Sequence, residues 1–291
     1  MSTGRAAHTT TLLRSGRTLV AGGISSKSII PLSISRCELY DYKSDKWIEA
    51  PNMSAARAGH TATLLSSGNV LVIGGLSGGD IVSSCEIYNA SGNNWTSAAN
   101  MNISRALHTT TLLPSGHILV AGGGENDPST CELYNPQSNK WTSAAKMSVT
   151  RIGHTAILLS TGKVLVAGGI NPIFEFWSSC EIYDPHTNQW TAAAKMSSER
   201  AAHTATLLHS GKVLVTGGAW HELLDFLDSC EVYDPLTNKW TEVASMSQGR
   251  AGHTATLLPS GQVLVTGGEL GEPFAELYDP VSDKWTPADD S

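Results

Sequence analysis

The chain repeats one sequence pattern six times, and this repetition constrains the fold more than any other feature. Each copy reads Arg-x-x-His-Thr, then Leu-Val-x-Gly-Gly, then Glu-x-Tyr, and ends at a tryptophan. The arginines recur at intervals of about 50 residues, at Arg5, Arg57, Arg105, Arg151, Arg200 and Arg250. The tryptophans keep the same spacing, at Trp47, Trp95, Trp141, Trp190, Trp240 and Trp285. A period of this length predicts an architecture in which each copy is one supersecondary unit.

The strands of one repeat follow from its polar and apolar pattern. Residues 203–208 alternate in polarity, and a His-Ser-Gly turn leads into residues 212–216, an apolar run typical of a strand buried on both faces. After a Gly-Gly pair and a variable loop, residues 230–233 predict a third strand and residues 239–242 a short outer strand. Four antiparallel strands make a blade, and arranging six blades radially buries faces that a lone blade would leave in water. We therefore expect the repeated tyrosines and tryptophans to belong to the core.

The Gly-Gly doublet, the Tyr and the Trp at this period resemble the kelch repeat, in which each unit is one four-stranded propeller blade. Three sequence segments are similar to the repeats of galactose oxidase and its bacterial relatives: His-Thr-Ala-Thr-Leu-Leu, Gly-Lys-Val-Leu-Val and Glu-x-Tyr-Asp-Pro. We therefore expect an all-β, six-bladed propeller in a single domain, residues 1–291, closed without an exchanged strand. The expected blades span about residues 1–52, 53–100, 101–146, 147–195, 196–245 and 246–291.

Composition and charge limit the function classes. The chain is 41% hydrophobic but has no apolar run near the roughly 18 residues that a membrane helix needs. Met1 is in register with Met53 and Met246, so the first residues are assigned to the repeat and not to a signal peptide. A net charge of −7 argues against a nucleic-acid surface, which is normally basic. We expect a monomer without a membrane or nucleic-acid partner.

Five cysteines occupy one equivalent position of the repeat, namely Cys37, Cys85, Cys131, Cys180 and Cys230. Strands lie about 4.8 Å apart, which places neighbouring equivalents in a six-fold ring roughly 15 Å from one another. A disulfide spans only about 7 Å between Cα atoms. We therefore expect unpaired thiols and a cytoplasmic location. Secretion is the alternative, because Asn52, Asn89, Asn94 and Asn102 begin Asn-x-Ser/Thr triplets.

A catalytic or metal site is not expected. The repeated histidines, whose side chains point toward neighbouring blades, are better interpreted as inter-blade hydrogen-bonding groups than as zinc ligands. They are His8, His60, His108, His154, His203 and His253. The resemblance to galactose oxidase implies copper held by histidines and tyrosines, with one tyrosine crosslinked to a cysteine. Outside the repeat register only Tyr42, His117, His186, His209 and His221 remain for such a site. We expect no enzyme and no cofactor; the alternative is a carbohydrate-binding or galactose oxidase-like relative without a recognisable catalytic centre.

Function is expected where the repeats differ, in the loops between the second and third strands, which emerge on the same face as the segments that enter the first strands. All four phenylalanines and both tryptophans outside the register lie in the loops of the last three blades. The candidate partner-binding residues are Phe174, Phe176, Trp177, Trp220, Leu223, Phe226 and Phe274. Large apolar groups on loops form either an exposed contact surface or a local core. We favour a scaffold that binds a protein or peptide, and the acidic residues of the same loops favour a basic or mixed partner.

The repeated arginines are a second candidate, as anion-binding groups at the mouth of the channel. In kelch proteins that capture acidic peptides, the contacting arginines come from this segment. Against this, each repeat also carries one glutamate, at Glu38, Glu86, Glu132, Glu181, Glu231 and Glu276. Bidentate pairing within a blade would consume the donors that a ligand needs. We favour structural pairing, with an anionic ligand as the alternative if several arginines are unpaired.

Overall fold

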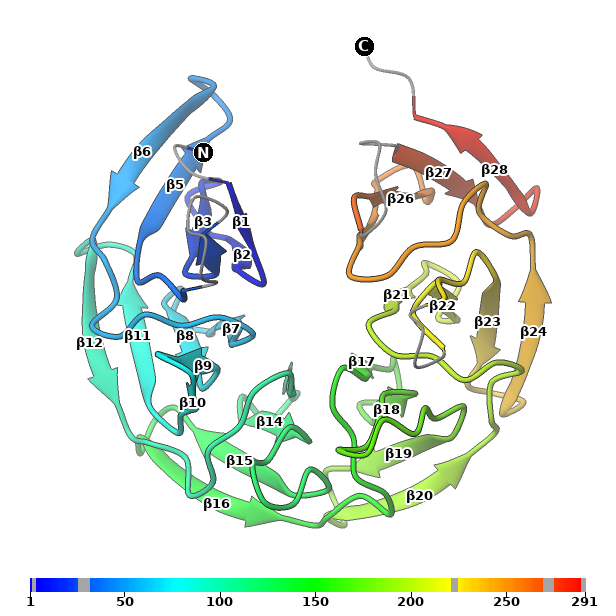
Figure 1. Cartoon of the computed structure of the whole chain (residues 1–291), viewed down its shortest axis with the longest axis horizontal. Helices are drawn as coiled ribbons and strands as arrows, with labels where there is room; N and C mark the ends of the chain where they lie inside the picture. Colours follow the sequence, from blue (N-terminus) through cyan, green and yellow to red (C-terminus); the bar gives the residue numbers. More distant parts are fainter. Residues whose placement is uncertain (2–3, 26–31, 221–224, 269–274, 289–291) are drawn as a thin grey trace. The chain divides into compact units, whose positions relative to one another are not determined.

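The computed structural model describes residues 1, 4–25, 32–220, 225–268 and 275–288. Within them the chain forms six four-stranded antiparallel sheets, each built from the strands of one repeat (Figure 1). The fold is therefore an all-β, six-bladed propeller, and in the described residues no blade borrows a strand from another repeat. No helix in this part of the chain is long and apolar enough to span a bilayer. The chain divides into two compact units, Met1–Lys146 and Met147–Ser291, of three blades each.

The first unit contains blades one to three. Blade one consists of β2 (Thr9–Leu12), β3 (Thr18–Ala21), β5 (Cys37–Asp41) and β6 (Lys46–Ala50). Blade two consists of β7 (Thr61–Leu64), β8 (Val70–Ile73), β11 (Cys85–Asn89) and β12 (Asn94–Ala98). Blade three consists of β13 (Thr109–Leu112), β14 (Ile118–Ala121), β15 (Cys131–Asn135) and β16 (Lys140–Ala144). Two short pairs lie outside the blades: β1 (Arg5–Ala6) with β4 (Ile24–Ser25), and β9 (Leu76–Ser77) with β10 (Asp80–Ile81).

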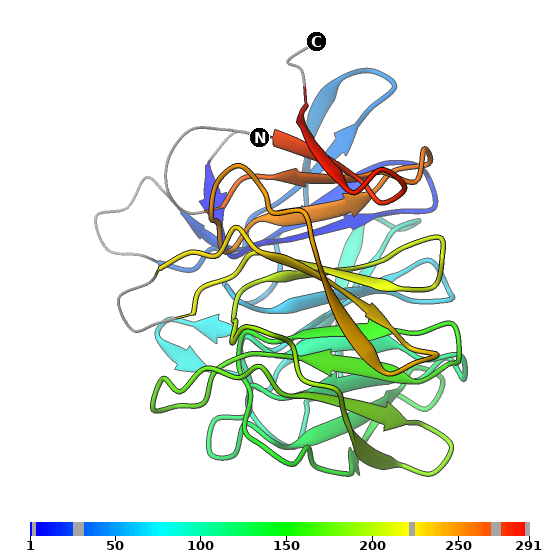
Figure 2. The ribbon, with the colours of Figure 1, turned by 90° about the vertical axis from the view of Figure 1, so that its right-hand side faces the viewer.

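The second unit contains blades four to six. Blade four consists of β17 (Thr155–Leu158), β18 (Val164–Ala167), β19 (Cys180–Asp184) and β20 (Gln189–Ala193). Blade five consists of β21 (Thr204–Leu207), β22 (Val213–Thr216), β23 (Cys230–Asp234) and β24 (Lys239–Val243). Blade six consists of β25 (Thr254–Leu257), β26 (Val263–Thr266), β27 (Ala275–Asp279) and β28 (Lys284–Pro287). In each unit the tight turns lie at one end of the blades and the loops that follow the second strands lie at the other end (Figure 2).

The core lies between neighbouring blades of a unit. The second strands are buried on both faces, as the apolar runs predict; all four residues of β8 have no exposed surface. In the second unit, Leu214 and Met246 pack with Val263, Val265 and Tyr278 of blade six. Within a unit, the hydrophobic effect therefore holds successive blades together, because each blade covers an apolar face of the next.

The repeated histidines join neighbouring blades, as expected. His60 Nε2 of blade two lies 2.9 Å from Thr9 Oγ1 of blade one, and His203 Nε2 of blade five lies 2.9 Å from Thr155 Oγ1 of blade four. Burial holds the histidine pKa well below its usual value; for His60 it is lowered to about 3, with a further contribution from the Arg57 charge. These imidazoles are therefore neutral near pH 7 and serve as hydrogen-bonding groups of the scaffold.

The repeated tryptophans differ from the expectation that they belong to the core. Tyr233 is buried, but Trp240 beside it, with ring centroids 5.0 Å apart, is only half-buried, and Trp47 is 41% exposed. The reason is that the tryptophan stands on the outer strand, which is the edge of the blade. Its indole N–H still reaches across: Trp240 Nε1 donates to the Ala194 carbonyl at the end of blade four, at 2.9 Å. The tryptophan thus joins two blades at their rim.

Candidate functional site

The repeated arginines are buried and paired, which corrects their assignment as anion-binding candidates. Each guanidinium forms an ion pair with the glutamate of its own blade, as the pairing interpretation predicts. The pairs are Arg5–Glu38, Arg57–Glu86, Arg105–Glu132, Arg151–Glu181, Arg200–Glu231 and Arg250–Glu276, with N–O distances from 2.7 to 3.1 Å. The arginine side chains are 0% exposed, except for 5% at Arg250.

Arg57 shows how the two terminal nitrogens of these guanidinium groups are used within the blade. Its Nη1 donates to the carbonyls of Gly74 and Ser84, and its Nη2 donates to Ser84 Oγ and to Glu86 Oε1. The carboxylate in turn accepts from the backbone N–H groups of Ser54 and Ala55. The buried charges are therefore compensated by each other and by hydrogen bonds, as a buried ion pair requires.

The loop of blade four, residues 170–179, forms a rigid tip around the side chain of Asn171. Its Oδ1 accepts hydrogen bonds from the backbone N–H groups of Ile173 and Glu175, at 3.1 and 2.9 Å, and its Nδ2 donates to Glu175 Oε2 at 2.8 Å. Backbone hydrogen bonds between Asn171 and Phe174 and between Asn171 and Glu175 close the same turn. An asparagine that bonds to nearby backbone groups in this way fixes a turn.

This turn presents two large apolar side chains to solvent. Ile173 is 72% exposed and Phe174 is 64% exposed. Phe174 has a φ of +62°, in the left-handed region that bulky residues rarely adopt. Backbone strain of this kind costs on the order of 1–3 kcal/mol and persists only where the surroundings impose it. Asn171 supplies the bonds that impose it.

The other candidate aromatics of blades four and five are half-buried. Phe176 pairs with Ile170 and Phe226 pairs with Ala219 through isolated β-bridges, so both lie on small hairpins. The indole N–H of Trp177 donates to the Thr150 carbonyl at 3.0 Å. The partial burial of these three residues and the hydrogen bond of Trp177 agree with local packing, which was the alternative interpretation of the candidates.

Trp220 opens the loop of blade five and is 44% exposed. Leu223 and Phe274 lie outside the described residues. We call the exposed Ile173, Phe174 and Trp220 the loop surface of the second unit. The sequence identified its two aromatics but not which members of the set face solvent. Nothing in the sequence pattern indicated that the Asn171 side chain would hold Phe174 in its exposed position.

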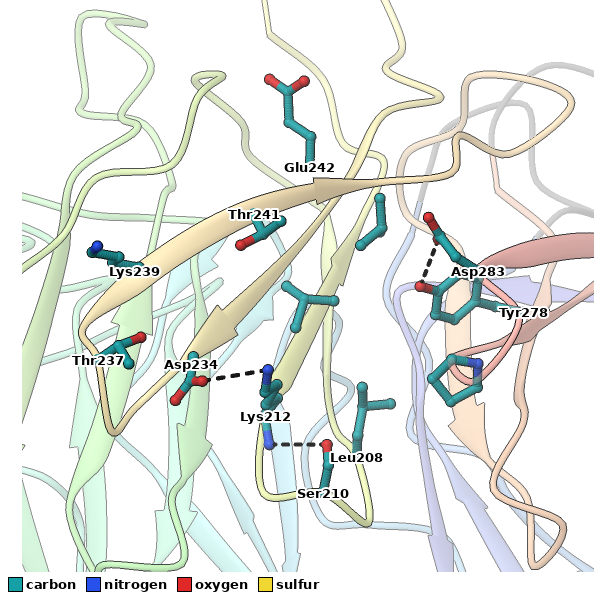
Figure 3. A pocket seen from close by; sticks show the side chains of 13 residues that line it. Leu208, Ser210, Lys212, Asp234, Thr237, Lys239, Thr241, Glu242, Tyr278 and Asp283 are labelled. Atoms are coloured by element: carbon teal, nitrogen blue, oxygen red, sulfur yellow. Dashed lines mark hydrogen bonds and ion pairs between the residues drawn. The ribbon is translucent and has the colours of Figure 1, made fainter.

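A hollow of about 490 Å³ lies elsewhere in the second unit, between blades five and six (Figure 3). Leu208 and Val232 contribute apolar surface, and Lys212 and Tyr278 lie at the rim. Lys212 Nζ is paired with Asp234 Oδ2 at 3.3 Å, and the Tyr278 hydroxyl donates to Asp283 Oδ1 at 3.0 Å. Tyr278 has a pKa raised by burial and by the Asp283 carboxylate, which opposes its use as a base. Two polar pairs of the hollow are thus bonded within the fold.

The five cysteines are free and buried. Burial raises the pKa of Cys37 to about 11 and that of Cys85, Cys180 and Cys230 to about 12. Reactive cysteines carry depressed pKa values, so these thiols are structural. Among the residues that the structure describes, no group of three or more His, Cys, Asp or Glu side chains is placed to hold a metal ion.

Comparison with known proteins identifies the repeat family. The family model described as Attractin/LZTR1 beta-propeller matches residues 130–276, just over half of the chain. The chain belongs to this family. The model described as Kelch motif matches residues 57–102 and 108–148 of this propeller, which confirms the resemblance to kelch repeats.

Solved structures agree on the fold of this kelch propeller. One of the similar structures, described as "Structure of YjhT", aligns with a TM-score of 0.76 over 98% of this chain and 97% of its own, at 17% sequence identity. At this identity the similarity shows the fold alone. The comparison with curated proteins found no match.

Proposed function

We propose that this kelch propeller is a protein-interaction module that binds a partner protein or peptide at the loop surface of its second unit. The observation that carries the proposal is the exposed, strained Phe174 on a turn held by Asn171. A rigid aromatic anchor lowers the entropy lost on binding, because the loop is already ordered in the free protein. Aromatic residues dominate the binding energy of many interfaces.

The fold itself does not require these exposed groups. The corresponding loop of blade three, residues 124–130, is short and polar and folds back on Asp127, whose Oδ1 accepts from the Ser129 N–H and hydroxyl. Ser129 and Thr130 are buried there, and no large apolar residue is exposed. A blade is therefore complete with a compact polar loop, and the apolar tip of blade four serves another purpose.

The test is an affinity capture that compares three forms of the protein. The anchor variant carries Phe174→Ser and Trp220→Ser. The matched control carries Leu236→Ser and Val281→Ser, two apolar residues that are 91% and 93% exposed on the tight turns. Partners retained by the wild type and the control but lost from the anchor variant, with all three melting alike, are the expected result. Equal capture by the anchor variant would refute the loop surface as the binding site.

The proposal also covers the setting in which the module acts. We propose a monomer in the reducing cytoplasm, which the five unpaired thiols support. No catalytic step is part of this proposal. An oxidase-like or carbohydrate-binding activity would instead show as copper in the purified protein or as a change in tryptophan fluorescence on adding sugars.

A further inference from the structure

We infer that the partner segment is cationic: a peptide stretch in which lysines or arginines flank a bulky apolar side chain. This inference rests on the proposed function and specifies the chemistry of the partner at the same surface. It is carried by the charge distribution of the second unit, which is independent of the aromatic anchors.

The sequence segments between the second and third strands of blades four to six contain acidic residues and no lysine or arginine. Residues 170–179, 219–229 and 269–274 include no lysine or arginine. Their acidic residues are Glu175, Glu222, Asp225, Asp228, Glu269 and Glu272. Of these, the structure describes Glu175, Asp225 and Asp228, and all three are exposed. Glu199, in the segment that leads into blade five, adds a fourth exposed carboxylate.

Most basic residues of the second unit are buried or lie at the tight-turn end of the blades. Arg151, Arg200 and Arg250 are inside the blades and paired with their glutamates. The lysines belong to the tight turns and to the outer strands or the residues after them; they are Lys163, Lys195, Lys212, Lys239 and Lys284. Lys163 and Lys212 are paired there with Asp184 and Asp234. Lys195 is the exception, because it lies two residues after β20, in the exposed segment that also contains Glu199. Four exposed carboxylates, those of Glu175, Glu199, Asp225 and Asp228, therefore outnumber one lysine in the described part of this end of the unit.

These carboxylates are not used by the fold as ion pairs. Neither Asp225 nor Asp228 forms a salt bridge with any residue that the structure describes, and Glu175 bonds to the uncharged Asn171 amide. Like charges gathered on one surface repel one another, and a cationic partner relieves that repulsion as it binds. Complementary charge also raises the rate of encounter.

The two features together define the partner segment. Phe174 and Ile173 offer apolar contact to a bulky side chain, and the face of Trp220 suits a guanidinium or ammonium group through a cation–π contact. The surrounding carboxylates suit lysines and arginines on either side. An anionic membrane or a nucleic acid would be repelled by the same carboxylates.

The experiment is a selection of short random peptides, displayed on phage, against the full chain. Enriched peptides are synthesised with a fluorescent label and titrated by fluorescence anisotropy against three proteins: the wild type, the anchor variant, and a charge variant carrying Glu175→Gln, Asp225→Asn and Asp228→Asn. Glu242→Gln, on the outer strand β24, is the control for loss of an exposed carboxylate elsewhere. Circular dichroism melting establishes that every variant is folded.

The expected peptides combine basic residues with a bulky apolar one and lose affinity for the anchor variant. They bind the charge variant about tenfold more weakly, since three exposed ion pairs each contribute a fraction of a kcal/mol, and the affinity falls further with added salt. Glu242→Gln binds them as the wild type does. Peptides that need the anchors but are neutral or acidic would overturn the charge inference and leave the proposed function intact. Peptides that bind the anchor variant normally, or no enrichment at all, would count against both.

Discussion

A repeated arginine such as Arg57 bonds to two neighbouring blades at once. The guanidinium of Arg57 bonds within blade two, while its backbone N–H donates to the Ile34 carbonyl and its carbonyl accepts from Gly23, both in blade one. One residue thus anchors the segment that enters blade two and holds it against blade one. Removing the side chain would leave a buried carboxylate unpaired, which is why such positions tolerate little change.

The residue before each repeated histidine offers a test of local strain. Ala202 has a φ of +52°, whereas glycine takes the equivalent position at Gly153 and Gly252. We expect Ala202→Gly to stabilise the protein by about 0.5–1 kcal/mol, because glycine adopts this conformation without a steric cost. Urea unfolding measures the difference. The neighbouring Ala201→Gly, at a residue without a positive φ, is the control and should destabilise; equal effects would exclude relief of strain as the cause.

The buried thiols give a second prediction at this scale. We expect the native protein to react slowly with a thiol reagent at pH 8, because burial raises the cysteine pKa values to about 11 or 12. In denaturant without a reductant, all five cysteines should react. A denatured count of three or fewer would contradict the free state of the thiols.

At the scale of the element, the loop of blade four holds one aromatic side chain against the fold and exposes another to solvent. Trp177 bonds back to the segment that leads into β17, while Phe174 is held away from it at an unfavourable φ. A loop that maximised stability would not place phenylalanine there. Under the proposed function, the strained φ is the stability given up to present the ring.

Two substitutions in this loop should therefore shift stability in opposite directions. We expect Phe174→Gly to raise the free energy of unfolding by about 1 kcal/mol while weakening partner binding, since it relieves backbone strain but removes the anchor. Trp177→Ala should lower it by about 2 kcal/mol through lost packing and a lost hydrogen bond. Thermal unfolding followed by circular dichroism compares the two, and a Phe174→Gly protein less stable than wild type would mean that the ring is part of a local core.

The strands could be predicted well from the sequence, because the polar and apolar pattern of each strand recurs in every repeat. The ranges 212–216 and 239–242 correspond closely to β22 and β24. Exposure within the loops could not be derived, because it depends on hydrogen bonds such as those of Asn171, which follow no period. The half-buried tryptophans were missed for a related reason: composition indicates an apolar ring but not whether its strand lies at an edge.

At the scale of the whole molecule, the repeated histidines make stability depend on pH. Their pKa values are lowered in the folded state, chiefly by burial: to about 3 for His60 and His154 and about 4 for His253. An unfolded chain takes up these protons near pH 6.5, whereas the folded chain does not. The stability is therefore complete above pH 6.5 and is lost as the pH falls toward 3 or 4.

We expect the urea midpoint to drop steeply between pH 6.5 and pH 4, with each histidine contributing about 1.4 kcal/mol per pH unit at most. His60→Gln should make the dependence shallower at the cost of some stability at neutral pH. The exposed His186→Gln, outside the repeat register, should leave the slope unchanged. A midpoint that stays level down to pH 4 would show that the histidines can ionise within the fold.

The arginine segments of blades five and six bond to the loop of the preceding blade through backbone groups: Arg200 N–H donates to the Trp177 carbonyl, and Arg250 N–H donates to the Leu227 carbonyl. Every amino acid carries a carbonyl, so these joints place no demand on the identity of the loop side chains. Lineages that inherit such a chain can consequently replace one of these loops by another, by drift or by recombination, without disturbing the assembly of the blades. The sequences of the loops and the construction of the blades are thereby inherited as separate traits.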